Sequence, residues 1–329
     1  MSSVTETFIP TLKNIQDAAR LLEGLAVRTP LLESPQLNDL TGGRILVKAE
    51  MLQRTGSFKF RGAYNKMSRI SETDKAKGVV AYSSGNHAQA VAASAKLLGM
   101  SAVIIMPKDA PEIKINNTRG YGAEVILYDR MKDSREAIGE KIALERGATL
   151  IKPYDDPLII SGQGTLGLEM AGQARDMNAR LDAVLIPCSG GGLSSGCATA
   201  FNAVSPETNI YSVEPEGYDD MAQSLSSGRK VAVDGKAKSI CDALLTPTPG
   251  DITFAIASKL LAGGLVVSDK DAANAMTTAF SMLKVVVEPG GSVGLAAVLS
   301  GAYDARGKTV GIICSGGNVD AKTFTAALR

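Results

Sequence analysis

The stretch Ala183–Gly196, AVLIPCSGGGLSSG, decides the fold that this sequence predicts. Its apolar run Ala183–Pro187 is typical of a buried strand, and the run leads through Ser189–Gly192 into the helical stretch Ser194–Val204. Glycines permit a sharp turn whose N–H groups converge at the positive end of a helix, so the segment predicts a phosphate-binding cup. It matches neither a Walker loop nor GxGxxG. A plain glycine turn is the alternative, and three consecutive glycines at a strand–helix junction favour the cup over it.

Outward from this stretch, short apolar runs alternate with helical ones. Buried strands are predicted at Ser101–Met106, Glu124–Tyr128, Thr149–Ile151, Ile210–Val213 and Val310–Cys314. Two helices, Asn86–Leu98 and Ser134–Arg146, are each followed by a glycine that suits the position after a helix end. This alternation predicts an α/β protein with open, twisted, mostly parallel sheets and helices on both faces.

Two polar segments, Ser71–Gly78 and Lys152–Pro157, are candidates for the crossings between two domains. The stretch between them holds about three strand–helix units, which is small for a complete α/β domain. We therefore expect a small domain over residues 71–153, inserted in a large domain built from residues 1–70 and 154–329. Ligands of open α/β sheets bind beyond the carboxyl ends of the strands, so the cleft between the domains is the expected site.

The composition narrows the classes of function. The 329 residues include 35 Lys plus Arg and 34 Asp plus Glu, so the net charge of +1 predicts neither a nucleic-acid partner nor an anionic membrane surface. The start, MSSVTETFIP, has no secretory signal pattern, which together with four cysteines that form no CxxC pair predicts a cytoplasmic protein with reduced thiols. His87 is the single histidine, so multi-histidine metal sites are excluded, and lysine, carboxylate or serine must carry most acid–base chemistry.

Lys59 lies between two aromatic residues in Thr55–Ala63, TGSFKFRGA. Most lysines are solvated surface charges, but flanking Phe58 and Phe60 indicate a partly desolvated amine. Desolvation lowers the pKa of a lysine and makes its amine nucleophilic, which an aldehyde cofactor would exploit.

A run of short polar residues opens the helix predicted from Asn86. The run Ser83–Gln89, SSGNHAQ, can be an ordinary helix cap, but it also offers several converging donors for a carboxylate. His87 is more simply read as a helix-start residue with a satisfied side chain.

Two further segments carry polar groups after predicted strands. Cys314–Val319, CSGGNV, is a second strand-to-glycine turn. The carboxylates of Val213–Asp220, VEPEGYDD, are either a solvated loop or oxygen ligands for a hard cation such as Mg²⁺, and spacing alone leaves both open.

Taken in order, SFKFRGA, SSGNH, SGGGL, VEPEGYDD and SGGNVD resemble the fold-type II pyridoxal-phosphate enzymes, a tryptophan-synthase-β-like group. The most similar members are threonine dehydratase, serine racemase and 3-hydroxyaspartate dehydratase. The resemblance runs from about Phe8 to Asp320. It implies pyridoxal 5′-phosphate as cofactor, an amino-acid substrate and a homodimer.

Carried over by position, the resemblance implies a role for each matching residue. Lys59 forms the Schiff base with the cofactor, and Phe58 packs against its ring. Asn86 bonds the 3-hydroxyl and Ser315 faces the pyridine nitrogen. The cofactor phosphate is held by Ser189, Gly190, Gly191, Gly192 and Leu193. The substrate α-carboxylate is surrounded by Ser83, Ser84, Asn86 and His87.

The same resemblance implies a second catalytic face and a metal site. Ser84 matches the serine that acts opposite the lysine in serine racemase, and Glu214, Asp220 and the carbonyl of Tyr218 match its divalent-metal site. One departure is Ala243, where many relatives have glycine, so a contact with the cofactor ring is in doubt there.

Three functions compete at this stage. The first is an ammonia-lyase that removes water from a β-hydroxy-α-amino acid, and Ser315 favours it because a serine cannot hold the pyridine nitrogen protonated as a carboxylate would. Arg135 resembles the arginine that reaches dicarboxylate ligands in serine racemase, which narrowly favours 3-hydroxyaspartate, giving oxaloacetate, over threonine or serine. The second is a serine- or aspartate-type racemase with elimination as a side reaction. The third is a non-catalytic phosphometabolite-binding protein that uses SGGGL alone.

Overall fold

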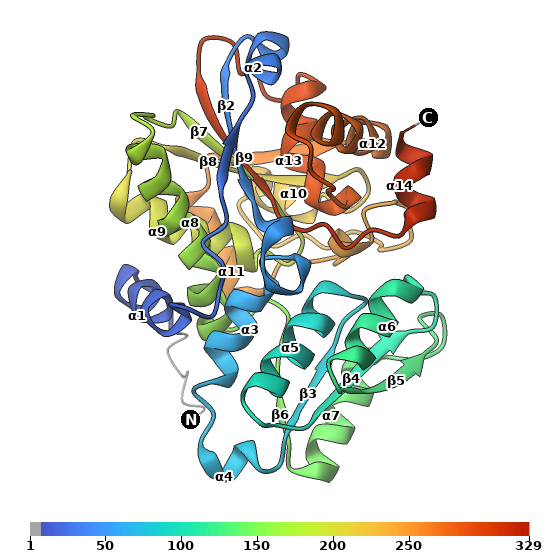
Figure 1. The fold of residues 1–329 in the computed structure, drawn as a ribbon. Coiled ribbons are helices and arrows are strands. Elements are labelled where there is room, and N and C mark those ends of the chain that lie inside the picture. Colours follow the sequence, from blue (N-terminus) through green and yellow to red (C-terminus); the bar gives the residue numbers. More distant parts are fainter. Residues whose placement is uncertain (1–7, 329) are drawn as a thin grey trace.

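A computed structural model of the chain describes residues 8–328. It contains two sheets, a six-stranded one in the upper half of Figure 1 and a four-stranded one in the lower half. We call residues 79–150, which contain the four-stranded sheet, the small lobe, and the other described residues the large lobe. The prediction that the chain carries no secretory signal rests on residues 1–10. Residues 1–7 lie outside the part of the chain that the structure describes.

The large sheet has the order β1-β2-β10-β7-β8-β9, and only β1 runs antiparallel to its neighbour. Its strands are β1 Leu31–Glu33, β2 Arg44–Ala49, β7 Ala183–Pro187, β8 Asn209–Pro215, β9 Gly263–Val267 and β10 Thr309–Cys314. The small sheet is parallel throughout, in the order β5-β4-β3-β6. Its strands are β3 Val79–Tyr82, β4 Ala102–Pro107, β5 Glu124–Tyr128 and β6 Thr149–Leu150.

The central strands of both sheets are buried on both faces, as in parallel sheets generally. Successive residues of β7 belong to different cores: Leu185 packs in one hydrophobic cluster, while Val184 and Ile186 pack in another. In the small lobe, Val79 and Val80 divide between two clusters in the same way. Side chains alternate along a strand, so a continuous apolar run feeds two cores at once.

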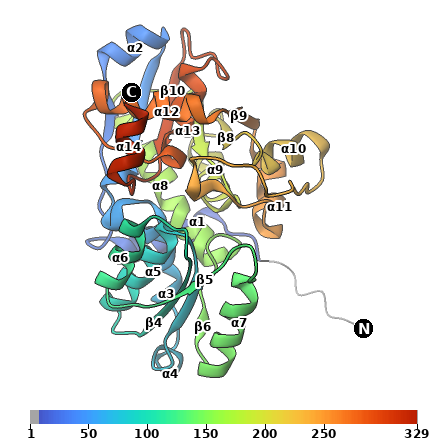
Figure 2. The same cartoon turned by 90° about the vertical axis from the view of Figure 1, so that its right-hand side faces the viewer.

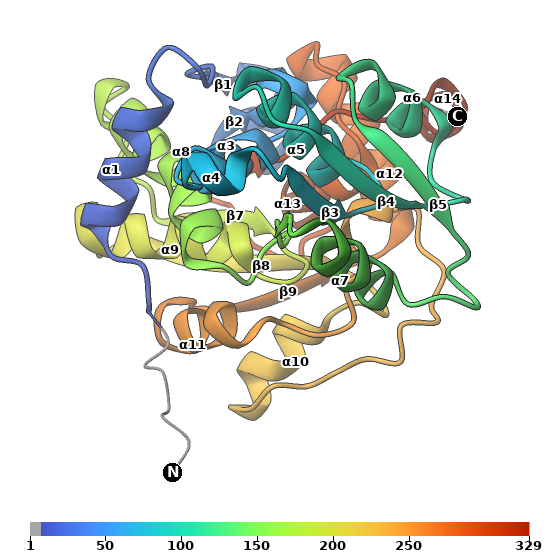
Figure 3. The same ribbon diagram turned by 90° about the horizontal axis from the view of Figure 1, so that it is seen from below.

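Helices supply the outer layers. In the large lobe, α8 and α9 cover one face of the sheet and α12 and α13 the other, as Figures 1 and 3 show. In the small lobe, α5 and α6 lie on one side of the sheet and α7 on the other (Figure 2). The α-helices are α1 Leu12–Leu22, α2 Pro35–Thr41, α3 Lys59–Met67, α4 Glu72–Lys75, α5 Asn86–Leu97, α6 Glu112–Gly120, α7 Arg135–Arg146, α8 Pro157–Asp176, α9 Gly192–Val204, α10 Asp220–Ser227, α11 Asp251–Leu260, α12 Asp269–Thr278, α13 Pro289–Leu299 and α14 Ala321–Ala327. Short helical turns are η1 Glu50–Leu52, η2 Arg54–Gly56, η3 Asp242–Leu244 and η4 Ala279–Leu283.

The predicted fold class is confirmed, and most predicted elements fall within one or two residues of the observed ones. The helix expected from Ser194 begins earlier, at Gly192, because Gly191 adopts φ +90° and ends the turn there. The domain boundaries near residues 70 and 153 stay a prediction, since α3 packs against both α5 and α8. Among residues 8–328, no helix combines the length and apolar character needed to cross a bilayer.

Candidate active site

A cleft of about 930 Å³, counting its open mouth, lies between residues of the two lobes. It brings together, from distant parts of the sequence, the residues predicted for cofactor and substrate. Those lining it are Phe58, Lys59, Ser83, Ser84, Asn86, His87, Arg135, Ser189, Gly190, Gly191, Gly192, Leu193 and Ser315. The predicted metal ligands Glu214, Tyr218 and Asp220 do not line it. The roles assigned to the cleft residues stay predictions, but the structure brings these residues together around one cleft.

Lys59 is the first residue of α3, directly after the turn that carries Phe58. Its Nζ lies 2.9 Å from the carbonyl oxygen of Pro153 and 5.1 Å from the centre of the Phe58 ring. Burial lowers the pKa of this lysine to about 8, because water no longer stabilises the charged form. Phe60 instead is fully buried and packs against Tyr64. Of the two flanking aromatics, Phe58 is therefore the one that faces the amine.

The glycine turn joins β7 to α9 and is supported from behind. The hydroxyl of Thr253 donates to the carbonyl oxygen of Gly190 at 2.7 Å. Glycine is required here for space as well as for conformation: a Cβ on Gly190 would lie 2.4 Å from the Tyr154 ring, and one on Gly191 2.8 Å from Met221. The first N–H groups of α9 have no acceptor within the helix, so the turn presents a concave set of donors at a helix N-terminus. These features fit the phosphate of a cofactor.

The start of α5 supplies the opposite wall. Ser83 and Ser84 are half-buried, whereas Asn86 and His87 are buried. The amide of Asn86 donates to Glu288 and accepts from Asn318 at 2.8 Å.

His87 is held in its neutral form. One ring nitrogen, Nε2, lies 3.0 Å from the carbonyl oxygen of Ile151. Burial, with a further contribution from Lys59, lowers the pKa of the imidazole to about 3. The other ring nitrogen, Nδ1, is buried and has no hydrogen-bond partner among residues 8–328, so the expectation of a fully satisfied side chain is met at Nε2 only.

Arg135 is the first residue of α7 and reaches the cleft from the small lobe. Its side chain is 27% exposed, and its guanidinium carbon lies 5.5 Å from the centre of the Tyr82 ring. Nε donates to Glu136 at 2.7 Å. Arg135 is thus not a freely solvated surface charge but an oriented cation at the wall of the site.

The predicted metal site lies at the end of β8. Glu214 is buried and accepts from the N–H groups of Met221 and Ala222 at 3.1 and 2.8 Å. Asp220 is also buried, and within residues 8–328 neither of its carboxylate oxygens has a hydrogen-bond partner. Burial raises the pKa of Asp220 to about 7 and that of Glu214 well above its usual range. A cation would satisfy these buried oxygens, although the described residues hold no cluster of three or more acidic, His or Cys ligands.

Several cleft residues were missed by sequence reasoning. Lys114, Asp242, Arg130 and Tyr154 line the cleft, and Glu288 lies behind it, bound to Lys114 and Asn86. In the sequence each is an isolated polar residue in a helix or loop, so no local pattern separates it from a surface residue. Ala243, whose place glycine takes in many relatives, lines the cleft too and packs beside Gly290.

Comparison with known proteins assigns the family. The family model described as pyridoxal-phosphate dependent enzyme matches residues 22–316. L-threo-3-hydroxyaspartate ammonia-lyase from Saccharomyces cerevisiae is 44% identical over 320 residues, covering 97% of each protein. A solved threonine deaminase from T.th. has a TM-score of 0.89 and 44% identity, covering 94% of this chain and 99% of that one. A maize serine racemase structure has a TM-score of 0.91 and 37% identity, covering 98% and 97%.

The chain therefore belongs to the pyridoxal-phosphate-dependent enzyme family. The resemblance to fold-type II members and the dependence on pyridoxal phosphate are both confirmed. The third of the competing functions, a non-catalytic protein that binds a phosphometabolite, is set aside.

Proposed function

We propose that this protein is an ammonia-lyase that acts on 3-hydroxyaspartate and gives oxaloacetate and ammonia. The single observation that carries the proposal is the cleft itself, in which a half-buried lysine, a glycine phosphate turn and an oriented arginine face one space. The yeast relative named for 3-hydroxyaspartate is similar over 97% of the chain, which supports both the reaction class and the substrate.

Each part of the cleft would hold one part of the cofactor or substrate. Lys59 would bind the aldehyde of pyridoxal phosphate, Gly190–Leu193 its phosphate, and Ser315 would face its ring nitrogen. When bound, the cofactor supplies an electron sink that makes the Cα proton of the amino acid acidic. The start of α5 would bind the α-carboxylate, where the helix N-terminus favours an anion.

Lys59 is suited to move the Cα proton. A lysine with a pKa of about 8 has an appreciable neutral fraction near neutral pH, so its Nζ can accept that proton. The β-hydroxyl then takes up a proton and leaves as water, and hydrolysis of the resulting imine consumes one water and releases ammonia. The net products of 3-hydroxyaspartate are oxaloacetate and ammonia.

The charges along the cleft support a dicarboxylate substrate. Arg130 and Arg135 line it, paired with Asp109 and Glu136 respectively, whereas the charge of Lys114 is already shared by Asp242 and Glu288. Among residues 8–328, the hydrogen bond of Arg135 goes to Glu136 through Nε, which leaves the outer edge of the guanidinium for a second carboxylate. Threonine has a methyl group at that position and would gain nothing from it.

The experiment compares kcat/KM for the hydroxyaspartate isomers, L-threonine, L-serine and D-serine, in the wild type and in Arg135→Ala. Loss of one charged contact should cost hydroxyaspartate about 2–4 kcal/mol in transition-state binding and threonine far less. Arg146→Ala is the matched control, because Arg146 ends the same helix and pairs with Glu124 on the surface. Better turnover of threonine by the wild type, or equal losses in Arg135→Ala, would reject hydroxyaspartate in favour of threonine or serine.

A racemase is the second candidate, because Ser84 lines the cleft and the maize relative is a serine racemase. As a racemase the protein would use Lys59 and Ser84 on opposite faces of the Cα atom. Product analysis separates the two: an ammonia-lyase releases the 2-oxo acid, while a racemase accumulates the opposite epimer.

Three further features belong to the proposal. Glu214, Asp220 and the Tyr218 carbonyl would bind Mg²⁺ or another divalent cation, supported by the unpaired buried carboxylate of Asp220. A homodimer is supported by exposed apolar side chains such as Phe280 and Val286. A cytoplasmic location follows from the sequence argument alone.

A further inference from the structure

Lys114, on α6 of the small lobe, is only 1% exposed although it lies at the cleft. Its Nζ donates to Asp242 Oδ2 at 2.7 Å and to Glu288 Oε2 at 3.1 Å. Asp242 belongs to η3 and Glu288 caps α13, so both acceptors come from the large lobe. These ion pairs therefore join the two lobes at the cleft.

Glu288 binds two separate segments of the small lobe at once. Its Oε2 accepts from Lys114 on α6, and its Oε1 accepts from the amide of Asn86 at the start of α5. Asn86 is also held from the large lobe by Asn318, at 2.8 Å. The residues expected to meet the substrate carboxylate are thus held through the same carboxylate that pairs with Lys114.

Gly85 shows that the stem of Lys114 lies directly against the turn before α5. A Cβ on Gly85 would lie 2.3 Å from Cδ of Lys114 and 3.2 Å from its Cε. This close approach leaves no space for a side chain at position 85. Lys114 and the Ser83–Asn86 turn must therefore move together.

Electrostatics makes the contact specific. A buried ion that loses its partner is strongly disfavoured, so Lys114 and Glu288 stay buried only while the lobes are in contact. The charged groups that face Glu288 are Lys114 from α6 and Asp242 from η3. Since two carboxylates share one ammonium, removal of Lys114 leaves two like charges at the interface.

We infer that Lys114 is a positioning residue that fastens the small lobe to the large lobe and sets the Ser83–Asn86 turn against the site. It acts through Glu288, Asp242 and Gly85. The inference rests on the proposed function only in its activity readout, because the contacts themselves lie within the polypeptide.

The experiment measures amide hydrogen exchange in cofactor-free protein carrying Lys114→Met or Lys114→Arg. In Lys114→Met, exchange over residues 83–98 and 112–120 should rise about tenfold or more, and Lys114→Arg should restore most of the protection. Lys77→Met is the control, since Lys77 forms an exposed pair with Asp74 and does not line the cleft, and it should leave both segments unchanged. Wild-type exchange in Lys114→Met, or no rescue by arginine, overturns the inference.

Kinetics with 3-hydroxyaspartate give a second readout. Lys114→Met should raise KM about tenfold or more and change kcat much less, because the disturbed turn binds substrate whereas Lys59 does the chemistry. A loss of similar size in kcat, with KM unchanged, would contradict a positioning role.

If Lys114→Met does not fold, Asp242→Asn serves in its place, because Asp242 is partly exposed. This variant should show the same increase in exchange over residues 83–98 and 112–120, to a smaller degree. Exchange equal to that of the wild type in Asp242→Asn would also contradict the inference. If exchange rises in Lys114→Met but the wild type turns over no hydroxy amino acid, the proposed function is rejected and the inference about Lys114 stands.

Discussion

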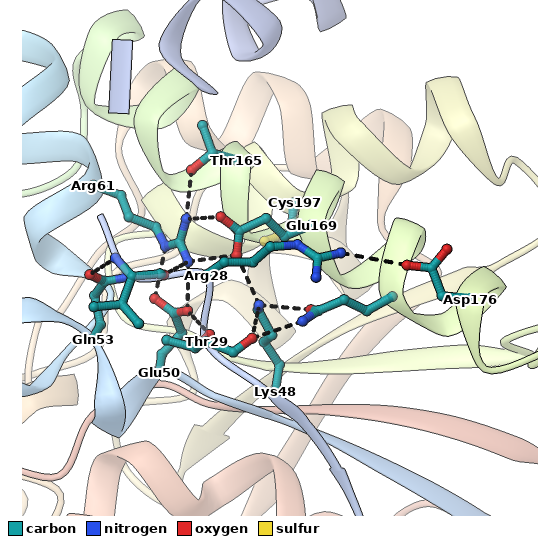
Figure 4. A network of polar contacts seen from close by, with 12 residues as sticks. Arg28, Thr29, Lys48, Glu50, Gln53, Arg61, Thr165, Glu169, Asp176 and Cys197 are labelled. Atoms are coloured by element: carbon teal, nitrogen blue, oxygen red, sulfur yellow. Dashed lines mark hydrogen bonds and ion pairs between the residues drawn. The ribbon is translucent and has the colours of Figure 1, made fainter. Parts of the chain in front are cut away.

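Arg61 should be among the residues whose loss destabilises this protein most. It lies two residues after Lys59, is fully buried, and is paired with Glu50 and Glu169 at 2.8 Å each. Lys48 completes the network through Glu169 at 2.9 Å, as Figure 4 shows. Burial alone would lower the pKa of Arg61, but the two carboxylates outweigh it and raise the pKa. For Lys48 burial prevails and lowers the pKa.

The magnitude follows from what Arg61→Met leaves behind. Glu50 would keep only the hydroxyl of Thr29, 2.6 Å away, while remaining inaccessible to water. Removal of one partner from a buried pair costs about 3–5 kcal/mol, which is a large part of the roughly 5–15 kcal/mol by which proteins are stable. The double variant Glu50→Gln/Arg61→Met should be less destabilised than the sum of its single variants, since no full charge is then left at Glu50.

Chemical unfolding of the four proteins in this cycle measures these free energies. Arg146→Met provides the control, because Arg146 and Glu124 are half-exposed and such pairs contribute about 0–1 kcal/mol. A loss below about 1 kcal/mol for Arg61→Met, or strict additivity in the cycle, would refute the reasoning that a buried charge has been left without its partner.

Three further predictions concern the site. Cofactor-free protein should take up pyridoxal phosphate faster as pH rises to about 8, because only the neutral amine of Lys59 attacks an aldehyde; a rate that is flat from about pH 6 to 9, followed by visible absorbance, would contradict the lowered pKa. Ser84→Ala should suppress reaction of one α-epimer and spare the other, measured by chiral analysis of products, and equal losses would mean that Ser84 only binds substrate. If Glu214 and Asp220 bind a cation, a chelator should lower the melting temperature measured by calorimetry, and added Mg²⁺ should restore it. An unchanged melting temperature with chelator would mean that these two carboxylates bind no cation.

The sequence predicted the elements whose signals are local. The apolar run of β7 and the glycines after it form a strand and turn within one stretch of chain, and observed β7 and β5 match their predicted bounds. Strands β1, β2, β3 and β9 were missed, and β1 has only three residues. RILVKA of β2 carries Arg44 and Lys48, GGLVV of β9 opens with two glycines, and β3 has only four residues. Each is a strand because of the neighbours it pairs with, which its own composition does not reveal.

Buried charges were the residues that sequence reasoning could not find. Lys48 and Arg61 are ordinary surface residues by type, and their shared partner Glu169 lies over one hundred positions away. Lys114 and Glu288 are separated by 174 positions. A long-range ion pair leaves no periodic pattern, so its members emerge only when the fold brings them together. Lys59 was found because its flanking aromatics and motif are contiguous.

The most direct test of the central claim is an assay of oxaloacetate and ammonia released from 3-hydroxyaspartate by the protein loaded with pyridoxal phosphate, with Lys59→Ala alongside. The wild type should release the two products in equal amounts, and Lys59→Ala should fold with an unchanged melting temperature in the cofactor-free state yet release neither beyond a trace. Turnover by Lys59→Ala close to that of the wild type would contradict the assignment of Lys59, and failure of the loaded wild type to release either product would contradict the proposed reaction.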